Sequence, residues 1–176
     1  SSFSILFLFW TITMLARKMA RATGEIKKNT TIAILGSGTI GALAYTFTDS
    51  FWFSAVEGEV YAMSSFFTAI VFWAILKWDL EDDHYNSIED KTNATHPNRW
   101  ILFICYMIGL SIGVHLLNLL AIPAIVFVIY FKKYEFSWKS FIVAGFSALV
   151  VLGLIQSVII PTTVSVADMV ERLFTN

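Results

Sequence analysis

The sequence is short of charge. Asp, Glu, Lys and Arg make up 14% of the 176 residues, whereas a soluble domain carries about 25%. Hydrophobic residues make up 57% and aromatic residues 16%. The apolar residues form long runs that are separated by short charged clusters, a pattern typical of an integral membrane protein. The composition therefore argues against a soluble domain.

Several other features are scarce or missing. Cys105 is the single cysteine, which excludes an intrachain disulfide. There is no Cys/His cluster with zinc spacing and no Gly-rich nucleotide motif. Asp82-Asp83-His84 could be read as a metal site, but no second cluster at ligand spacing accompanies it, so a solvated surface loop is favoured. The sequence also lacks an initiator Met and a basic region before its first apolar run. We therefore expect a fragment of a longer polytopic protein.

The apolar runs predict about six membrane segments, at approximately residues 1–16, 30–48, 60–77, 100–113, 118–131 and 140–160. The run 100–131 is too long for one crossing and too short for two full ones, and basic residues flank both of its ends. A short hairpin that turns near Gly113 to Asn118 fits this pattern. Each arm would be about 13 residues, or roughly 20 Å long. Its apex would then lie below the outer membrane face, in a cavity lined by protein.

The positive charges predict the orientation of these segments. Five basic residues gather between residues 17 and 28, and the positive-inside rule places such a cluster in the cytoplasm. With six segments and both ends outside, all 12 Lys and Arg residues except Arg172 lie inside. The same arrangement makes residues 49–59 an outer loop and residues 161–176 an outer amphipathic tail, after a last span that stops at Pro161.

Polar residues that interrupt the apolar runs gather on the predicted outer face. Ionisable groups within or beside a membrane are functional candidates, and acids without basic partners need water, a metal ion or a ligand with donors. Plainer roles compete: an acid can cap a helix start, and a histidine in an apolar run can be a satisfied core residue. The candidate substrate-binding residues are Asp49, Glu57, Glu59, Tyr61, His115 and Asn118.

Two stretches carry a family resemblance. DSFWFSAVEGEVYAMSSFF, followed by GLSIGVHLLNLLAIPA and a YFKK end, resembles a bacterial protein O-mannosyltransferase-like membrane family, formerly a domain of unknown function. That family is similar to the GT-C glycosyltransferase superfamily. The resemblance implies an all-α, polytopic transmembrane bundle in the bacterial cytoplasmic membrane, with a periplasmic active face. It also implies transfer of a sugar, with mannose favoured, from a lipid-phosphate-linked donor to a protein hydroxyl or a glycan. Membrane lipid is a further expected partner, and nucleic acid is not.

The resemblance also implies where the catalytic base lies. In such enzymes the catalytic acid is in the first outer loop, within a Trp-Asp-Cys-Gly-Glu-type motif, and nothing in this sequence matches that motif. The base is therefore expected outside a fragment that lacks the first span and first outer loop. Glu57 and Glu59 fall in the second outer loop, where they would line the donor or acceptor cavity. A departing lipid phosphate needs cationic stabilisation, so a divalent metal ion is a candidate cofactor.

Two other function classes stay open from the sequence. A transporter or flippase-like carrier could use the predicted hairpin as its gate. A non-catalytic scaffold subunit of an envelope complex would need none of the acidic residues.

Overall fold

The computed structural model describes residues 2–56, 60–92 and 94–175, and its regular elements are all helices, with no strand in those residues. This confirms the predicted all-α class. The chain forms two compact units, Ser1–Ala121 and Ile122–Asn176.

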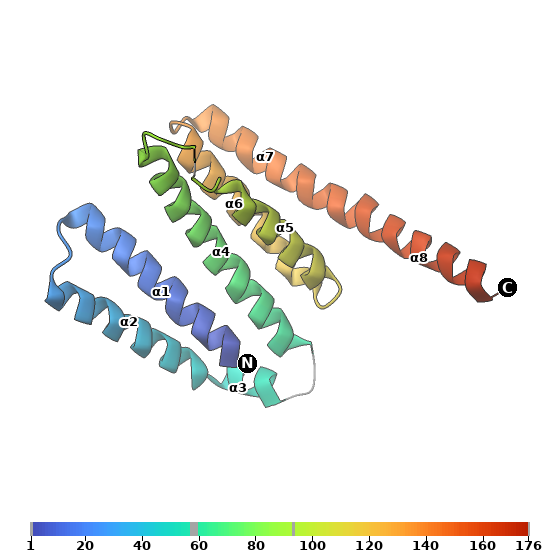
Figure 1. Ribbon diagram of the computed structural model, residues 1–176. Coiled ribbons are helices and arrows are strands. Elements are labelled where there is room, and N and C mark those ends of the chain that lie inside the picture. Colours follow the sequence, from blue (N-terminus) through green and yellow to red (C-terminus); the bar gives the residue numbers. More distant parts are fainter. Residues whose placement is uncertain (1, 57–59, 93, 176) are drawn as a thin grey trace. The chain divides into compact units, whose positions relative to one another are not determined.

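The first unit is a row of packed helices. Its elements are α1 (Ser2–Thr23), α2 (Lys28–Thr46), the short α3 (Asp49–Val56), α4 (Tyr61–Ser87), α5 (Asn98–Ile112) and the 3₁₀ helix η1 (Leu116–Leu120). Helix α2 packs on α1, α1 on α4, and α4 on α5 (Figure 1). Helices α1 and α4 run in the same direction, because Phe3 contacts Phe66 near their starts and Lys18 pairs with Asp79 nearer their ends.

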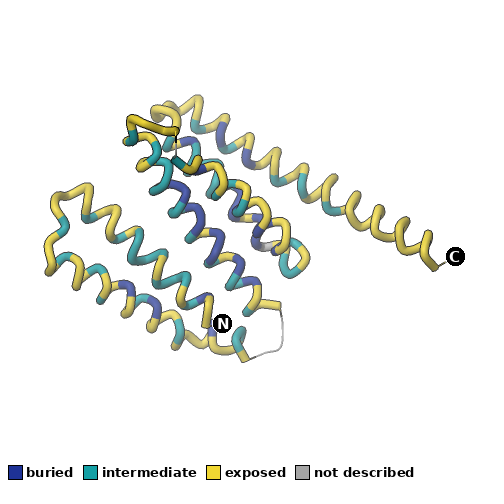
Figure 2. The backbone as a smooth tube through the Cα atoms, in the orientation of Figure 1, coloured by how far each residue is buried: buried dark blue, intermediate teal, exposed yellow. Residues whose placement is uncertain are grey.

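Helix α4 forms the centre of this unit. Figure 2 shows buried residues concentrated along it, among them Ile70, Val71, Ala74, Ile75 and Trp78. A helix that is apolar on several faces must be covered on more than one side. Helices α1 and α5 provide that cover.

Aromatic rings join the three helices. Trp73 of α4 contacts Phe7 of α1 at a centroid distance of 5.2 Å and Trp100 of α5 at 5.4 Å, both edge to face. Edge-to-face pairs contribute about 0.5–1.5 kcal/mol beyond the burial of their area. These contacts fix α4 against both neighbours.

Helices α1 and α2 approach each other at small residues. A Cβ atom on Gly38 would lie 2.5 Å from Cγ2 of Thr13, whereas one on Gly36 would meet nothing within 4 Å. Between the helices the chain reverses at Gly24, whose φ of +149° is accessible to glycine and strained for other residues. Gly38 therefore lies at the close approach of the two helices, and Gly36 does not.

Ion pairs gather at one end of the unit. Lys18 of α1 pairs with Asp79 of α4, and Arg99 at the start of α5 donates to Glu81 of α4 at 2.7 Å. Asp79 is buried, at 5% exposure. This end also carries the five basic residues of 17–28, so the helix directions bring together the charges that the sequence assigns to one side.

Several helices extend beyond the predicted spans. Residues 79–87, predicted as part of a loop, are helical, because the charged residues after Lys77 continue α4 to Ser87. Residues 49–56 of the predicted outer loop form α3. Three described helices are long and apolar enough to cross a membrane, or four if the bent α2–α3 pair counts as one span. These apolar helices indicate membrane association.

The second unit holds α6 (Ala121–Lys133), α7 (Trp138–Leu154), a π-helical turn (Ile155–Ile159) and α8 (Ile160–Thr175). Phe127 and Tyr130 of α6 contact Phe141 of α7. The hydroxyl of Tyr130 donates to the carbonyl of Ser137 in the connection between the two helices.

The last helix continues past Pro161, where the sequence predicts the span to stop. Residues Trp138–Thr175 form one continuous 38-residue helix. A proline inside a helix removes one hydrogen bond, and its ring meets the carbonyl of the residue four positions earlier. The π-helical turn accommodates the ring: Ile160 donates to the carbonyl of Ile155, which widens the helix just before Pro161. The tail, predicted as a separate segment after Pro161, is helical and continues α7.

The glycine contact between α1 and α2 gives a first prediction. Gly38→Ala should destabilise the protein by about 1–3 kcal/mol, because the new methyl group overlaps a β-branched side chain. The hydroxyl of Thr13 bonds to the carbonyl of Phe9, which restricts its movement away. Gly36→Ala is the matched control and should be neutral or stabilising by up to about 1 kcal/mol. Unfolding in mixed detergent measures both, and equal effects would contradict this packing.

The titration of Glu81, which lies beyond the predicted span 60–77, predicts how the stability of the protein depends on pH. Partial burial opposes the shift, but the hydrogen bond from Arg99 and the charges of Arg99 and Lys77 hold the pKa of Glu81 below its usual 4.5. A carboxyl with a lowered folded-state pKa stabilises the fold above its unfolded-state pKa and loses that contribution as the pH falls through the folded-state value. Thermal melts of the wild type and Glu81→Gln should therefore differ most at neutral pH and converge in acid. A difference that grows in acid would refute this.

Candidate functional site

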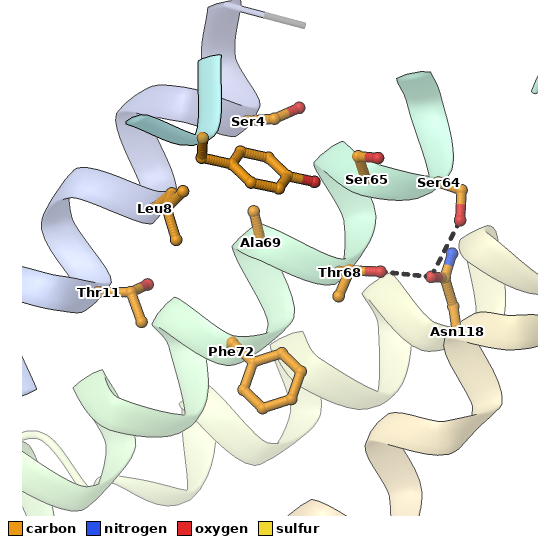
Figure 3. A pocket seen from close by; sticks show the side chains of 10 residues that line it. Ser4, Leu8, Thr11, Ser64, Ser65, Thr68, Ala69, Phe72 and Asn118 are labelled. Carbon is orange, nitrogen blue, oxygen red and sulfur yellow. Dashed lines mark hydrogen bonds between the residues drawn. The ribbon is translucent and has the colours of Figure 1, made fainter. Parts of the chain in front are cut away.

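A pocket of about 460 Å³ lies at the end of the first unit opposite to the ion pairs. Helices α1, α2 and α4 and the 3₁₀ helix η1 supply its walls (Figure 3). Its polar lining consists of hydroxyl and amide side chains, and its apolar lining includes Leu8, Ala69 and Phe72. The polar lining residues are Ser4, Thr11, Tyr45, Ser64, Ser65, Thr68 and Asn118.

Asn118 joins η1 to α4. Its Oδ1 accepts hydrogen bonds from the hydroxyl of Thr68, at 2.6 Å, and from that of Ser64, at 3.3 Å. Figure 3 shows the amide facing these two residues, which lie four positions apart on one face of α4. Asn118 is 6% exposed. Because its Nδ2 has no partner in the described part of the chain, a buried donor is left over.

Ser4 adds a second unused group from α1. The residue is 2% exposed, and its Oγ has no hydrogen-bond partner within the described ranges. An unpaired buried polar group costs about 1–3 kcal/mol by mutational measures. The pocket thus has two buried polar atoms available to a bound molecule, one on each side.

His115 lies next to this pocket. Its ring contacts that of Tyr61, at the start of α4, edge to face with centroids 5.5 Å apart. Its Nε2 is buried and lacks a partner among the residues that the structure describes. The imidazole is therefore in contact with an aromatic ring, while one of its buried nitrogens makes no hydrogen bond within the described residues.

The local backbone explains the position of His115. Helix α5 ends at Ile112, and the carbonyl of Ser111 accepts the N–H groups of both Val114 and His115. His115 is then extended, with φ −159° and ψ 126°, before η1 begins. The 3₁₀ helix η1 then returns Asn118 to α4. The helix therefore breaks between Ile112 and Leu116, within the predicted turn of the hairpin, and this break positions both polar side chains.

The structure places the predicted site residues as follows. Tyr61, His115 and Asn118 come together at one end of α4. Asp49 is exposed at the first position of α3 and does not line the pocket. Glu57 and Glu59 lie outside the described residues.

Sequence reasoning did not single out Ser4, Ser64 or Thr68. Serine and threonine are common in membrane helices, where their hydroxyls bond to the carbonyl three or four residues earlier, as Thr11 does to Phe7. The Ser64–Thr68 spacing is a signal of a polar face, but only the fold shows that Asn118 covers it.

No three His, Cys, Asp or Glu side chains gather as a metal-binding group within residues 2–56, 60–92 and 94–175. The lining of this pocket carries no Lys or Arg. The lining groups that can bind a ligand are therefore hydroxyls and an amide.

Residues 1–138 match the family described as the N-terminal domain of protein O-mannosyl-transferase TMEM260. The match spans every residue of the pocket, along with Tyr61 and His115. The chain belongs to this family. No curated protein and no solved structure matches the chain. The family supports the resemblance to O-mannosyltransferase-like proteins, and it concerns the N-terminal domain of such a protein.

The Asn118 contact predicts a coupled loss of stability. Thr68→Val should cost about 0.5–2 kcal/mol, because interhelical hydrogen bonds in membrane proteins contribute in this range. Thr39→Val is the control, since the hydroxyl of Thr39 is exposed and bonds to Leu35 of its own helix. In a double-mutant cycle, Thr68→Val should cost much less when Asn118→Leu is already present. Additive costs would show that the two side chains do not interact.

Proposed function

We propose that this chain forms the substrate-binding wall of a membrane O-mannosyltransferase. The sugar, with mannose favoured, would pass from a lipid-phosphate-linked donor to a protein hydroxyl or a glycan on the outer face of the membrane. The observation that carries this proposal is the group of three buried polar atoms without partners within the described ranges, Ser4 Oγ, Asn118 Nδ2 and His115 Nε2, at one end of a unit whose family is O-mannosyltransferase-related.

The chemistry of sugar transfer suits this lining. A sugar ring presents hydroxyls that donate and accept, and a lipid phosphate presents acceptors, so amide, hydroxyl and imidazole groups can bind both. Asn118 Nδ2 would donate to the donor, and His115 Nε2 would form a second hydrogen bond. The apolar wall at Leu8 and Phe72 suits the start of a lipid chain.

Three acidic residues that lie between α2 and α4 in the chain are also part of the proposed binding site. Glu57 and Glu59 separate α3 from α4 in the chain, close to Tyr61, and their carboxylates would accept hydrogen bonds from sugar hydroxyls. Asp49 begins the adjacent α3 and would bind substrate from solvent. The transfer also needs a base for the proton of the acceptor hydroxyl and stabilisation of the departing phosphate. We do not assign the base to a residue of this chain, and a divalent metal ion could serve the phosphate.

The wider architecture proposed with this function is a GT-C-type bundle in a bacterial cytoplasmic membrane with about six membrane segments. The three or four long apolar helices form part of that count. The helices α5 (15 residues) and α6 (13 residues) are too short for ordinary spans and would serve as the two arms of a hairpin.

The test is sugar transfer by the full-length protein in membranes. Labelled lipid-phosphate-linked mannose is the donor, and initial rates are measured against donor concentration. Asn118→Ala and His115→Ala should each raise KM or lower kcat/KM by roughly tenfold to a hundredfold, the loss expected for a hydrogen bond to a charged or buried partner. Glu59→Gln should also reduce transfer.

Controls separate a lost contact from a lost fold. His115→Gln places an amide near the position of Nε2 and should keep more activity than His115→Ala. Thr39→Val, on the exposed side of α2, should transfer like the wild type. All variants should insert into the membrane normally. Wild-type rates in the Asn118, His115 and Glu59 variants would remove these residues from the site, and no transfer by the unmodified protein would favour a carrier or a scaffold.

A further inference from the structure

A second pocket, of about 640 Å³, lies between α1 and α2 at the end of the first unit that carries the ion pairs. Arg17 and Arg21 of α1 line it, and their spacing of four residues places both on one face of that helix. It is separate from the pocket at Asn118, which lies towards the other end of α1.

The positive charge of this pocket is available. Neither Arg17 nor Arg21 has a salt-bridge partner in the described part of the chain. Lys18, which lies beside Arg17 in the sequence, pairs with Asp79 of α4 instead. Residues 17–28 carry five basic residues against one acid, Glu25. Glu25 also lines the pocket, so the two arginines leave the lining with one net positive charge, which still favours an anion.

The rest of the lining combines the polar Thr13, Thr31 and Glu25 with apolar side chains on both helices. Met14 of α1 and Ile34 and Leu35 of α2 lie one or more turns from the loop, towards the middle of the helices. The pocket therefore has a cationic rim and an apolar wall. A free inorganic anion would use the rim alone, whereas an amphiphile with an anionic head would use both.

The depth of the pocket also suits such an amphiphile. It lies where the apolar part of α1 changes to a basic loop, the position of a lipid headgroup. Basic clusters beside membrane helices attract anionic lipids by about 1 kcal/mol per Lys or Arg. Guanidinium groups add bidentate hydrogen bonds to phosphate oxygens.

We propose that the α1–α2 corner binds the phosphate headgroup of an anionic phospholipid. Arg17 and Arg21 contact the phosphate, and Met14, Ile34 and Leu35 contact the glycerol and the first acyl carbons. The site is independent of sugar transfer, because it shares no lining residue with the pocket at Asn118.

The experiment compares lipids on the whole chain purified in a neutral detergent. Thermal unfolding is followed while dioleoyl phosphatidylglycerol, dioleoyl phosphatidylcholine or inorganic phosphate is added. Phosphatidylglycerol should raise the midpoint saturably, and the other two should not. Arg17→Ala/Arg21→Ala should weaken the apparent Kd for phosphatidylglycerol by roughly tenfold to thirtyfold.

The matched control is Lys27→Ala/Lys28→Ala. It removes the same charge from the same corner, but neither lysine lines the pocket, so the apparent Kd should change less than about threefold. Equal losses in the two double variants would show diffuse attraction and overturn the site, as would an equal response to phosphatidylcholine. An equal response to inorganic phosphate would assign the site to a free anion and overturn the lipid proposal.

A second variant covers the case in which the alanine pair does not fold. Arg17→Lys/Arg21→Lys keeps the charge but loses the planar, bidentate donors. It should melt like the wild type without lipid and bind phosphatidylglycerol several-fold more weakly. Unchanged binding by this variant would also overturn the proposal.

Discussion

The burial of α4 between α1 and α5 is the constraint on which the first unit depends. An apolar helix in this position needs a partner on each side, and Trp73 contacts both partners through Phe7 and Trp100. With α4 held in this position, its two ends make different polar contacts. One end places Asp79 and Glu81 against basic residues, and the other places Ser64 and Thr68 against Asn118.

The end of α4 that carries Ser64 and Thr68 forms the candidate site. Polar atoms in an apolar protein need hydrogen-bond partners, because burial without them is costly. Ser64 and Thr68 satisfy the oxygen of Asn118, while the amide nitrogen, Ser4 Oγ and His115 Nε2 find no partner among the described residues. Such groups are stabilised by a ligand that supplies donors and acceptors. The donor that we propose, a sugar on a lipid phosphate, would supply both.

The helices and several candidate site residues can be predicted from the sequence, because hydropathy and the order of charges can be read along the chain. Apolar runs indicate the helices, and polar residues that interrupt them, such as His115 and Asn118, indicate candidate site residues. What the sequence does not predict depends on contacts across helices or on local helix geometry. The hydroxyl of Thr68 resembles that of any membrane threonine until Asn118 is placed beside it, and Pro161 predicts a helix end unless the π-helical turn before it is known. The extension of α4 past Lys77 depends on charged residues that favour helix as readily as loop.

We propose that the two ends of the first unit face opposite sides of the membrane. Single cysteines introduced by Asp49→Cys and Lys91→Cys, each in a Cys105→Ser background, test it most directly. A thiol reagent that does not cross membranes should label the position-49 cysteine in intact cells and the position-91 cysteine only after the membrane is opened. Labelling of both positions from the same side would contradict the account.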